Sequence, residues 1–190
     1  MNKEYDFLGV IPARGGSKGI PRKNIKEIGG KPLIQWTIES ALKSKLLDYS
    51  LVSTDDKEIV AVSRKKGIDV LDRPKDLAQD ESDMLSVLKH VLSIYKAKNI
   101  VLLQPTSPIR DDNLIDHSIQ KYKENNTDNL VTGFACKFRE YGTYTERRQE
   151  INGFFYNDGN INIINSNLIY NDTLIGMNPY RYYIDRWQNI

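Results

Sequence analysis

The chain has 190 residues, of which 39% are hydrophobic and 27% are charged, and its formal net charge is +2 at pH 7. This length fits one domain, residues 1–190, and so balanced a charge argues against nucleic acid as a partner. No apolar run reaches the roughly 20 residues of a membrane helix, no secretory signal opens the chain, and the single cysteine permits no internal disulfide, so we expect a cytoplasmic protein with no membrane partner.

Short apolar segments alternate along the chain with longer amphipathic ones. Apolar spacing and capping residues predict strands at 6–12, 50–55, 68–73, 99–105 and 129–136, and helices near 32–44, 56–66, 84–95 and 112–124. The strands are apolar rather than alternating, which is typical of a parallel sheet that is covered on both faces. We therefore predict an α/β fold with a mostly parallel sheet and helices on both sides.

Four polar stretches follow predicted strands: "PARGGSKG", "STDD", "DRPKDLAQDES" and "QPTSPIR". In parallel α/β sheets, ligands bind beyond the carboxyl ends of the strands. We expect the four stretches to meet at that edge and to form one site.

The loop in "VIPARGGSKGIPRKN" joins two adjacent glycines, a serine and four basic residues directly after the first strand. It matches neither a P-loop nor a dinucleotide fingerprint. One interpretation of this loop is an ordinary solvated turn. The position of the loop directly after the first strand favours phosphate binding instead. In that role Gly15 and Gly16 let the backbone approach oxygens and Ser17 donates a hydrogen bond. The charges of Arg14, Lys18 and Lys23 are of the kind that stabilises a leaving pyrophosphate.

The stretch "LLQPTSPIR" holds Gln104 at the end of a strand, between prolines that stiffen the exit. An amide offers both a donor and an acceptor, so Gln104 can recognise the edge of a base or a sugar. The alternative is a plain strand-ending loop, in which Arg110 is only a charge beside a helix.

The composition changes after Cys136, where Tyr, Asn and Gly become frequent. This predicts an extended arm or hairpin at about 138–157 and a returning strand at 160–164. The arm carries several aromatic residues, which favour a homodimer interface over a base-stacking surface: Tyr141, Tyr144, Phe154, Phe155 and Tyr156.

The motifs "IPARGGSKGIPRKN", "STDD", "RPKDLAQD" and "LLQPTSPIR", in this order and spacing, resemble the acylneuraminate cytidylyltransferase (CMP-sialic acid synthetase) family, from about residue 7 to the end of the chain. The related CMP-Kdo synthetases have a different first loop, without "GGSKG". The resemblance implies a Rossmann-like nucleotidyltransferase fold with a dimerisation arm. It also implies a homodimeric enzyme that uses Mg²⁺ and CTP to activate a nine-carbon sugar acid, giving a CMP-sugar and pyrophosphate.

Residue by residue, the resemblance implies a nucleotide site made by the first loop and by two later positions: Arg14, Gly15, Gly16, Ser17, Lys18, Lys23, Asn24, Arg73 and Ser82. Arg14, Lys18 and Lys23 would be the catalytic cations in it. Gln104 matches the glutamine near the sugar substrate.

Family members carry an Asp-x-Asp pair on a late strand that holds the divalent cation. In one alignment Tyr183 replaces the first aspartate; in the other, which fits the spacing from "NPY" better, Ile190 lies directly before the pair. In both alignments the metal site is incomplete in this chain, so we expect CTP binding with slow or no turnover. The alternatives are a truncated or inactive nucleotide-binding homologue, and a nucleotidyltransferase for Kdo or for a sugar phosphate with another nucleotide.

Overall fold

A computed structural model describes residues 3–138, 147 and 149–185. Within these residues, seven strands form one sheet in the order β5-β4-β1-β6-β8-β7-β9. Their bounds are β1 Glu4–Pro12, β4 Tyr49–Thr54, β5 Asp69–Asp72, β6 Lys96–Leu102, β7 Asn129–Cys136, β8 Phe154–Asn165 and β9 Pro179–Tyr183. Strands β5, β4, β1 and β6 run parallel to one another. Strand β8 is antiparallel to both β6 and β7, and β9 is parallel to β7.

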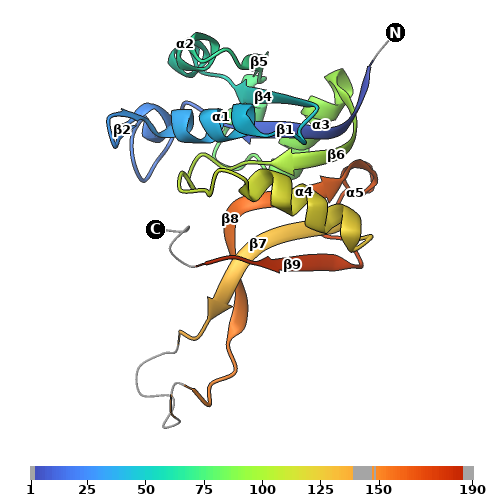
Figure 1. Cartoon of the computed structure of the whole chain (residues 1–190). Coiled ribbons are helices and arrows are strands. Elements are labelled where there is room, and N and C mark those ends of the chain that lie inside the picture. Colours follow the sequence, from blue (N-terminus) through green and yellow to red (C-terminus); the bar gives the residue numbers. More distant parts are fainter. Residues whose placement is uncertain (1–2, 139–146, 148, 186–190) are drawn as a thin grey trace.

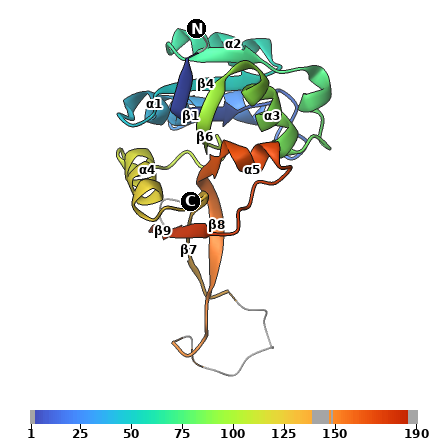
Figure 2. The same cartoon turned by 90° about the vertical axis from the view of Figure 1, so that its right-hand side faces the viewer.

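Helices cover both faces of this sheet, as the sequence predicts. They are α1 Leu33–Lys43, α2 Lys57–Lys65, α3 Met84–Ile94, α4 Leu114–Glu124 and the short α5 Ser166–Tyr170. In Figure 2, α1 and α4 lie on one side of the sheet and α3 and α5 on the other. Two 3-10 turns, η1 Lys23–Ile25 and η2 Lys75–Ala78, and a small hairpin, β2 Glu27–Ile28 with β3 Lys31–Pro32, lie in the connections (Figure 1).

Strand β1 explains why the strand sequences are apolar throughout. Its side chains alternate between the faces, so Phe7 and Ile11 join a core with α1, α2 and α4. Leu8 and Val10 point the other way, into a second core with α3 and α5. Each of these four side chains is at least 97% buried, and full burial of one stabilises the fold by roughly 1.5–3 kcal/mol.

Helix α2 begins and ends where its local sequence predicts. Asp56 is its N-cap, and the carboxylate accepts hydrogen bonds from the backbone N–H groups of Glu58 and Ile59. After the helix, Gly67 adopts a φ of 79°, a left-handed conformation that glycine tolerates best.

Strand β8 is much longer than the expected strand at 160–164, and the sequence did not predict β9 or α5. Beyond a shift in register between Val131 and Gly133, β8 pairs with β7 as far as Cys136 and Phe154. This ribbon projects from the body of the protein as the base of the predicted arm (Figure 1). Residues 139–146 and 148 of that arm lie outside the described residues.

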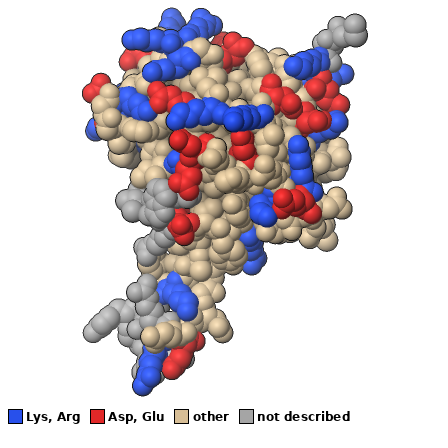
Figure 3. Space-filling view, viewed as in Figure 1, with Lys and Arg blue, Asp and Glu red and all other residues tan. Residues whose placement is uncertain are grey.

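No helix in the described part of the chain is long and apolar enough to cross a membrane. Acidic and basic side chains are mixed over the face seen in Figure 3, in keeping with the small net charge. This face offers no uniformly basic surface for a polyanion.

Candidate functional site

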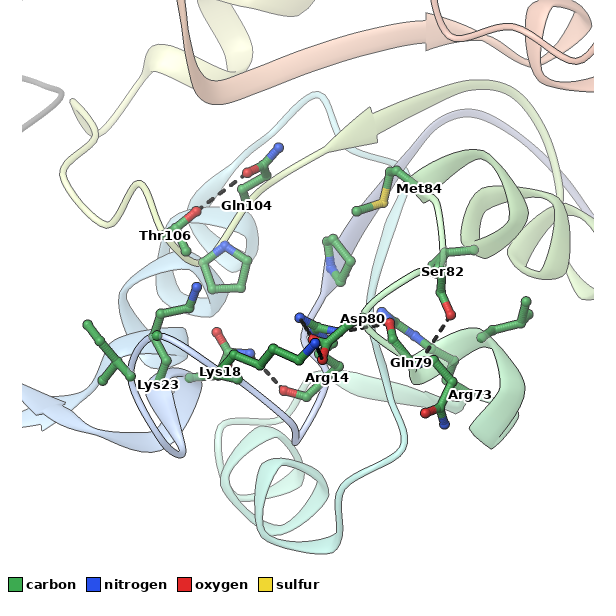
Figure 4. Close-up of a pocket in the computed structure, with 18 residues that line it drawn as sticks. Arg14, Lys18, Lys23, Arg73, Gln79, Asp80, Ser82, Met84, Gln104 and Thr106 are labelled. Atoms are coloured by element: carbon green, nitrogen blue, oxygen red, sulfur yellow. Dashed lines mark hydrogen bonds and ion pairs between the residues drawn. The ribbon is translucent and has the colours of Figure 1, made fainter.

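A cavity of about 720 Å³ opens beyond the carboxyl ends of β1, β5 and β6. The loop after β1, the segment after β5 and the segment after β6 all contribute to its walls (Figure 4). The lining residues are Pro12, Arg14, Ser17, Lys18, Gly19, Ile20, Lys23, Asn24, Arg73, Leu77, Gln79, Asp80, Ser82, Met84, Val87, Gln104, Pro105 and Thr106. Three of the four polar stretches therefore meet in one cavity, as predicted.

The fourth stretch, "STDD", does not line the cavity but forms hydrogen bonds to the segments that do. Asp55 accepts a hydrogen bond from the backbone N–H of Gly15 at 2.9 Å. Ser53 accepts two from Arg73, through its hydroxyl oxygen at 3.1 Å and its carbonyl at 2.7 Å. These contacts join the end of β4 to the loops on either side of it.

Four cationic residues line the cavity, Arg14, Lys18, Lys23 and Arg73. Burial lowers the pKa of Arg73 to about 10, so its guanidinium still carries a full charge at neutral pH. Lys18, by contrast, leaves 79% of its side chain exposed. The cavity therefore has one buried cation, Arg73, and one largely exposed cation, Lys18.

Asp80 is the one acidic residue among the described residues that line this cavity. Its carboxylate forms ion pairs with Arg14 at 2.6 Å and with Lys18 at 2.7 Å. The Lys18 ammonium, and after it the Arg14 guanidinium, lower the pKa of Asp80. Arg14 also donates a hydrogen bond to the carbonyl of Gln79 at 2.8 Å.

The two glycines of the first loop have different roles. A Cβ on Gly15 would lie 2.6 Å from a carboxylate oxygen of Asp56, whereas a Cβ on Gly16 would meet no atom within 4 Å. Packing against the Asp56 cap therefore requires glycine at position 15. The N–H of Gly15 donates to the Asp55 carboxylate, so this group already has a partner within the protein.

Asn24 and Ser82 line the cavity, yet their polar groups bind the protein itself. Asn24 is buried and donates from Nδ2 to the carbonyl of Arg14 at 3.0 Å. The Ser82 hydroxyl donates to the carbonyl of Asp76 at 2.9 Å and accepts from the N–H of Gln79 at 3.1 Å. Both residues shape the loops that hold the cations.

Gln104 follows β6 and lines the opposite side of the cavity (Figure 4). The hydroxyl of Thr106 donates to its side-chain oxygen at 3.4 Å. Gly159, with a φ of 69°, also lies near this amide, because a Cβ built on it would be 3.4 Å from the same oxygen. The Gln104 side chain therefore lies close both to its own loop and to Gly159 in β8.

The sequence of the chain matches a family model described as Cytidylyltransferase over residues 8–152. The chain belongs to the cytidylyltransferase family. Relatives include N-acylneuraminate cytidylyltransferase of Escherichia coli, 41% identical over 62% of this chain and 28% of that protein. The pseudaminic acid cytidylyltransferase of Campylobacter jejuni is 36% identical over 70% of this chain and 59% of its own. The chain thus spans between about a quarter and three fifths of these curated relatives.

Solved structures agree on the cytidylyltransferase fold. The structure of CMP:2-keto-3-deoxy-manno-octonic acid synthetase complexed with CTP has a TM-score of 0.76 at 17% identity, over 94% of this chain and 90% of that one. A 4-diphosphocytidyl-2C-methyl-D-erythritol synthase has a TM-score of 0.70 at 14% identity, over 98% and 91% of the two chains. The predicted Rossmann-like nucleotidyltransferase fold is confirmed.

The position of Arg110 is a feature beside the cavity that the sequence interpretation missed. Its guanidinium donates to the carbonyls of Gln104 and Asn160, at 2.9 and 3.0 Å, and to the Thr37 hydroxyl at 2.9 Å. Enclosure in the protein lowers the pKa of Arg110 to about 9, so it remains a cation at neutral pH. Arg110 is therefore a bridge between three elements, and the interpretation of a mere charge beside a helix is wrong.

A second cavity of about 670 Å³ lies beside the first and shares Ile20, Lys23 and Thr106 with it. Its walls are mostly apolar: Ile28, Leu33, Trp36, Pro108 and Ile109 contribute to them. No sequence motif indicates this second cavity, because its walls come from separate segments.

The described residues do not fit a site for the divalent cation that such enzymes generally use. They contain no group of three His, Cys, Asp or Glu side chains that could hold a metal ion. Asp55 and Asp56 already bind the N–H groups of Gly15 and of helix α2. One of the two alignments of the family's Asp-x-Asp pair runs through residues 186–190, which lie outside the described residues.

Proposed function

We propose that this cytidylyltransferase transfers CMP from CTP to a nine-carbon sugar acid and releases pyrophosphate. The names of the relatives support this substrate class: N-acylneuraminate, pseudaminic acid and, in a Legionella pneumophila relative that is 41% identical over 62% of this chain, N,N'-diacetyllegionaminic acid. The observation that carries the proposal is the meeting of four cations and Gln104 in one cavity beyond the strands.

The chemistry proposed is substitution at phosphorus. The hydroxyl oxygen of the sugar acid forms a bond to the α-phosphorus of CTP and loses its proton to solvent, while the bond from that phosphorus to the pyrophosphate oxygen breaks. Negative charge then grows on the pyrophosphate. Arg14, Lys18 and Lys23 would stabilise that charge in the transition state.

Gln104 is the proposed contact to the sugar acid. It lies across the cavity from the cations of the first loop, so a nucleotide bound to those cations would leave room beside the amide (Figure 4). The amide offers a donor and an acceptor to hydroxyl or carboxylate groups of the acceptor.

A two-part assay tests this function. CTP binding is measured by calorimetry, and CMP-sugar formation is followed separately with sialic, legionaminic and pseudaminic acids and Kdo, each with Mg²⁺. We expect CTP binding, and product with one of the nine-carbon acids in preference to Kdo. If a sugar phosphate becomes nucleotidylated instead, the proposed acceptor class is wrong.

The 190-residue chain should bind CTP better than it turns it over, because the described residues hold no group of three His, Cys, Asp or Glu side chains that could fix the cation. Extending its C-terminus with an Asp-x-Asp segment from a relative should raise turnover far more than affinity. Turnover of several per second by the unextended chain would refute this proposal.

We also propose a homodimer through the arm. Phe138, Phe154 and Tyr156 expose 62%, 55% and 45% of their surface at its base. Such aromatic exposure is typical of an interface. Light scattering at tens of micromolar should give twice the mass of one chain, and a monomer would contradict the proposal.

A further inference from the structure

Asp80 lies in the cavity in the manner of a bound anion. One carboxylate oxygen contacts Arg14 at 2.6 Å and the other contacts Lys18 at 2.7 Å (Figure 4). Two oxygens of a phosphate group make the same kind of contacts to paired cations. Asp80 thus neutralises part of the positive charge of Arg14 and Lys18, the cations that are proposed to bind the triphosphate of CTP.

The contact also connects two loops that are distant in the sequence. Arg14 follows β1, whereas Asp80 belongs to the segment after β5, and Arg14 holds that segment a second time through the Gln79 carbonyl at 2.8 Å. The segment is stiffened by the Ser82 hydroxyl, which binds both Asp76 and Gln79. When Arg14 turns toward another anion, it must release these contacts.

We propose that Asp80 determines specificity by competing with the phosphate groups of the ligand for Arg14 and Lys18. This inference rests on the proposed nucleotide site. With Asp80 in place, Arg14, Lys18 and Asp80 together carry a charge of +1; without it the two cations carry +2. A ligand with several negative charges displaces the carboxylate, whereas a nucleoside without phosphate leaves the ion pairs intact. Asp80 therefore lowers the affinity of the site for anionic ligands and leaves the affinity for uncharged ligands unchanged.

The expected effect is moderate, because the pairs are partly exposed. Asp80 leaves 30% of its side chain accessible and Lys18 leaves 79%. Partly exposed ion pairs are weak, so removing the carboxylate should raise the affinity for phosphorylated ligands about three- to tenfold.

The test compares Asp80→Asn with Glu81→Gln. Asparagine keeps the shape of Asp80 and removes its charge. Glu81 is the neighbouring exposed carboxylate and has no ion pair among the described residues, so it controls for the loss of one negative charge. The affinities of the unaltered chain and both variants for CTP, cytidine and inorganic pyrophosphate are measured by calorimetry at one ionic strength.

We expect Asp80→Asn to bind CTP and pyrophosphate about three- to tenfold more tightly, with cytidine affinity changed less than twofold and Glu81→Gln unchanged throughout. An unchanged or lower affinity of Asp80→Asn for pyrophosphate would overturn the inference. So would an equal gain for cytidine, or the same gain in Glu81→Gln.

The ligands separate this inference from the proposed function. If no form of the chain binds CTP in preference to pyrophosphate, yet Asp80→Asn gains affinity for pyrophosphate, the nucleotide proposal fails and the role of Asp80 holds. If CTP binds well and Asp80→Asn gains nothing, the role of Asp80 fails alone. Absence of binding by either ligand to any form contradicts both.

Discussion

Arg110 donates a hydrogen bond to the backbone carbonyl of Gln104, at 2.9 Å, and so fixes the residue proposed to meet the sugar acid. The same guanidinium nitrogen binds the Asn160 carbonyl in β8 at 3.0 Å, and the other terminal nitrogen binds the Thr37 hydroxyl in α1 at 2.9 Å. The end of β6 is thereby held against two elements that are far from it in the sequence.

Replacing Arg110 with Met should lower the free energy of unfolding by about 3 kcal/mol or more, because two enclosed carbonyls lose their donor. Thr37→Val removes one of the three contacts and should cost about 1 kcal/mol. Urea denaturation of both variants provides the comparison. Equal stabilities of the two variants would mean that the bonds to Gln104 and Asn160 contribute little.

Gly15→Ala should destabilise the protein by about 1–3 kcal/mol and weaken CTP binding, because the added methyl group displaces the Asp56 carboxylate that caps α2. Gly16→Ala is the matched control, since its methyl group enters open space. It should stay within about 0.5 kcal/mol of the unaltered chain. Thermal unfolding and CTP titration of both variants test the difference; a Gly16→Ala variant that is the less stable of the two would contradict it.

Arg14→Ala and Lys18→Ala should each weaken CTP binding about ten- to a hundredfold, since each loses a charge-assisted contact to phosphate worth roughly 1.5–3 kcal/mol. Lys65→Ala, an exposed cation at the end of α2, is the control and should leave the affinity unchanged. Calorimetric titration measures all three. If both loop variants bind CTP as the unaltered chain does, the first loop is only a scaffold.

Glu39 should make stability depend on pH. The ammonium of Lys31, with smaller contributions from Gln35 and Lys66, lowers the pKa of Glu39 to about 2. Because this pKa is depressed on folding, the contribution is complete above an ordinary carboxyl pKa of 4.5 and is lost as the pH falls toward 2.

Accordingly, Glu39→Gln should reduce the free energy of unfolding by about 1 kcal/mol at pH 7, a value discounted because a third of the side chain is exposed. The difference should shrink below pH 4.5 and vanish near pH 2. Glu124→Gln, which breaks a surface pair with Lys121, is the control. Urea denaturation across this range measures both; a difference that is constant with pH would exclude the ion-pair origin.

The sequence predicts those features that depend on neighbouring residues. The N-cap of α2 at Asp56 and its end before Gly67 are examples, because caps and left-handed residues act within one turn. The two buried faces of β1 follow in the same way from its unbroken apolar run. Cations beyond β1 could be assigned to a site because parallel strands end at a common edge.

Contacts between distant segments could not be predicted. The bond from Arg110 to Asn160 joins residues 50 positions apart, and the pair of Lys18 with Asp80 depends on how the segment after β5 folds back over the first loop. The bond from the Gly15 N–H to Asp55 likewise joins residues that are 40 positions apart. In each case a polar group finds its partner only through the tertiary fold.

Binding of CTP, compared with UTP, GTP and ATP, tests the proposed nucleotide site most directly. Each nucleotide is titrated by calorimetry into the unaltered chain and into Arg14→Ala, with Mg²⁺ present. We predict that CTP binds at least tenfold more tightly than the other three to the unaltered chain, and that Arg14→Ala weakens this binding. Equal binding of all four nucleotides, or no binding of CTP at millimolar concentration, would contradict a cytidylyltransferase site in this cavity.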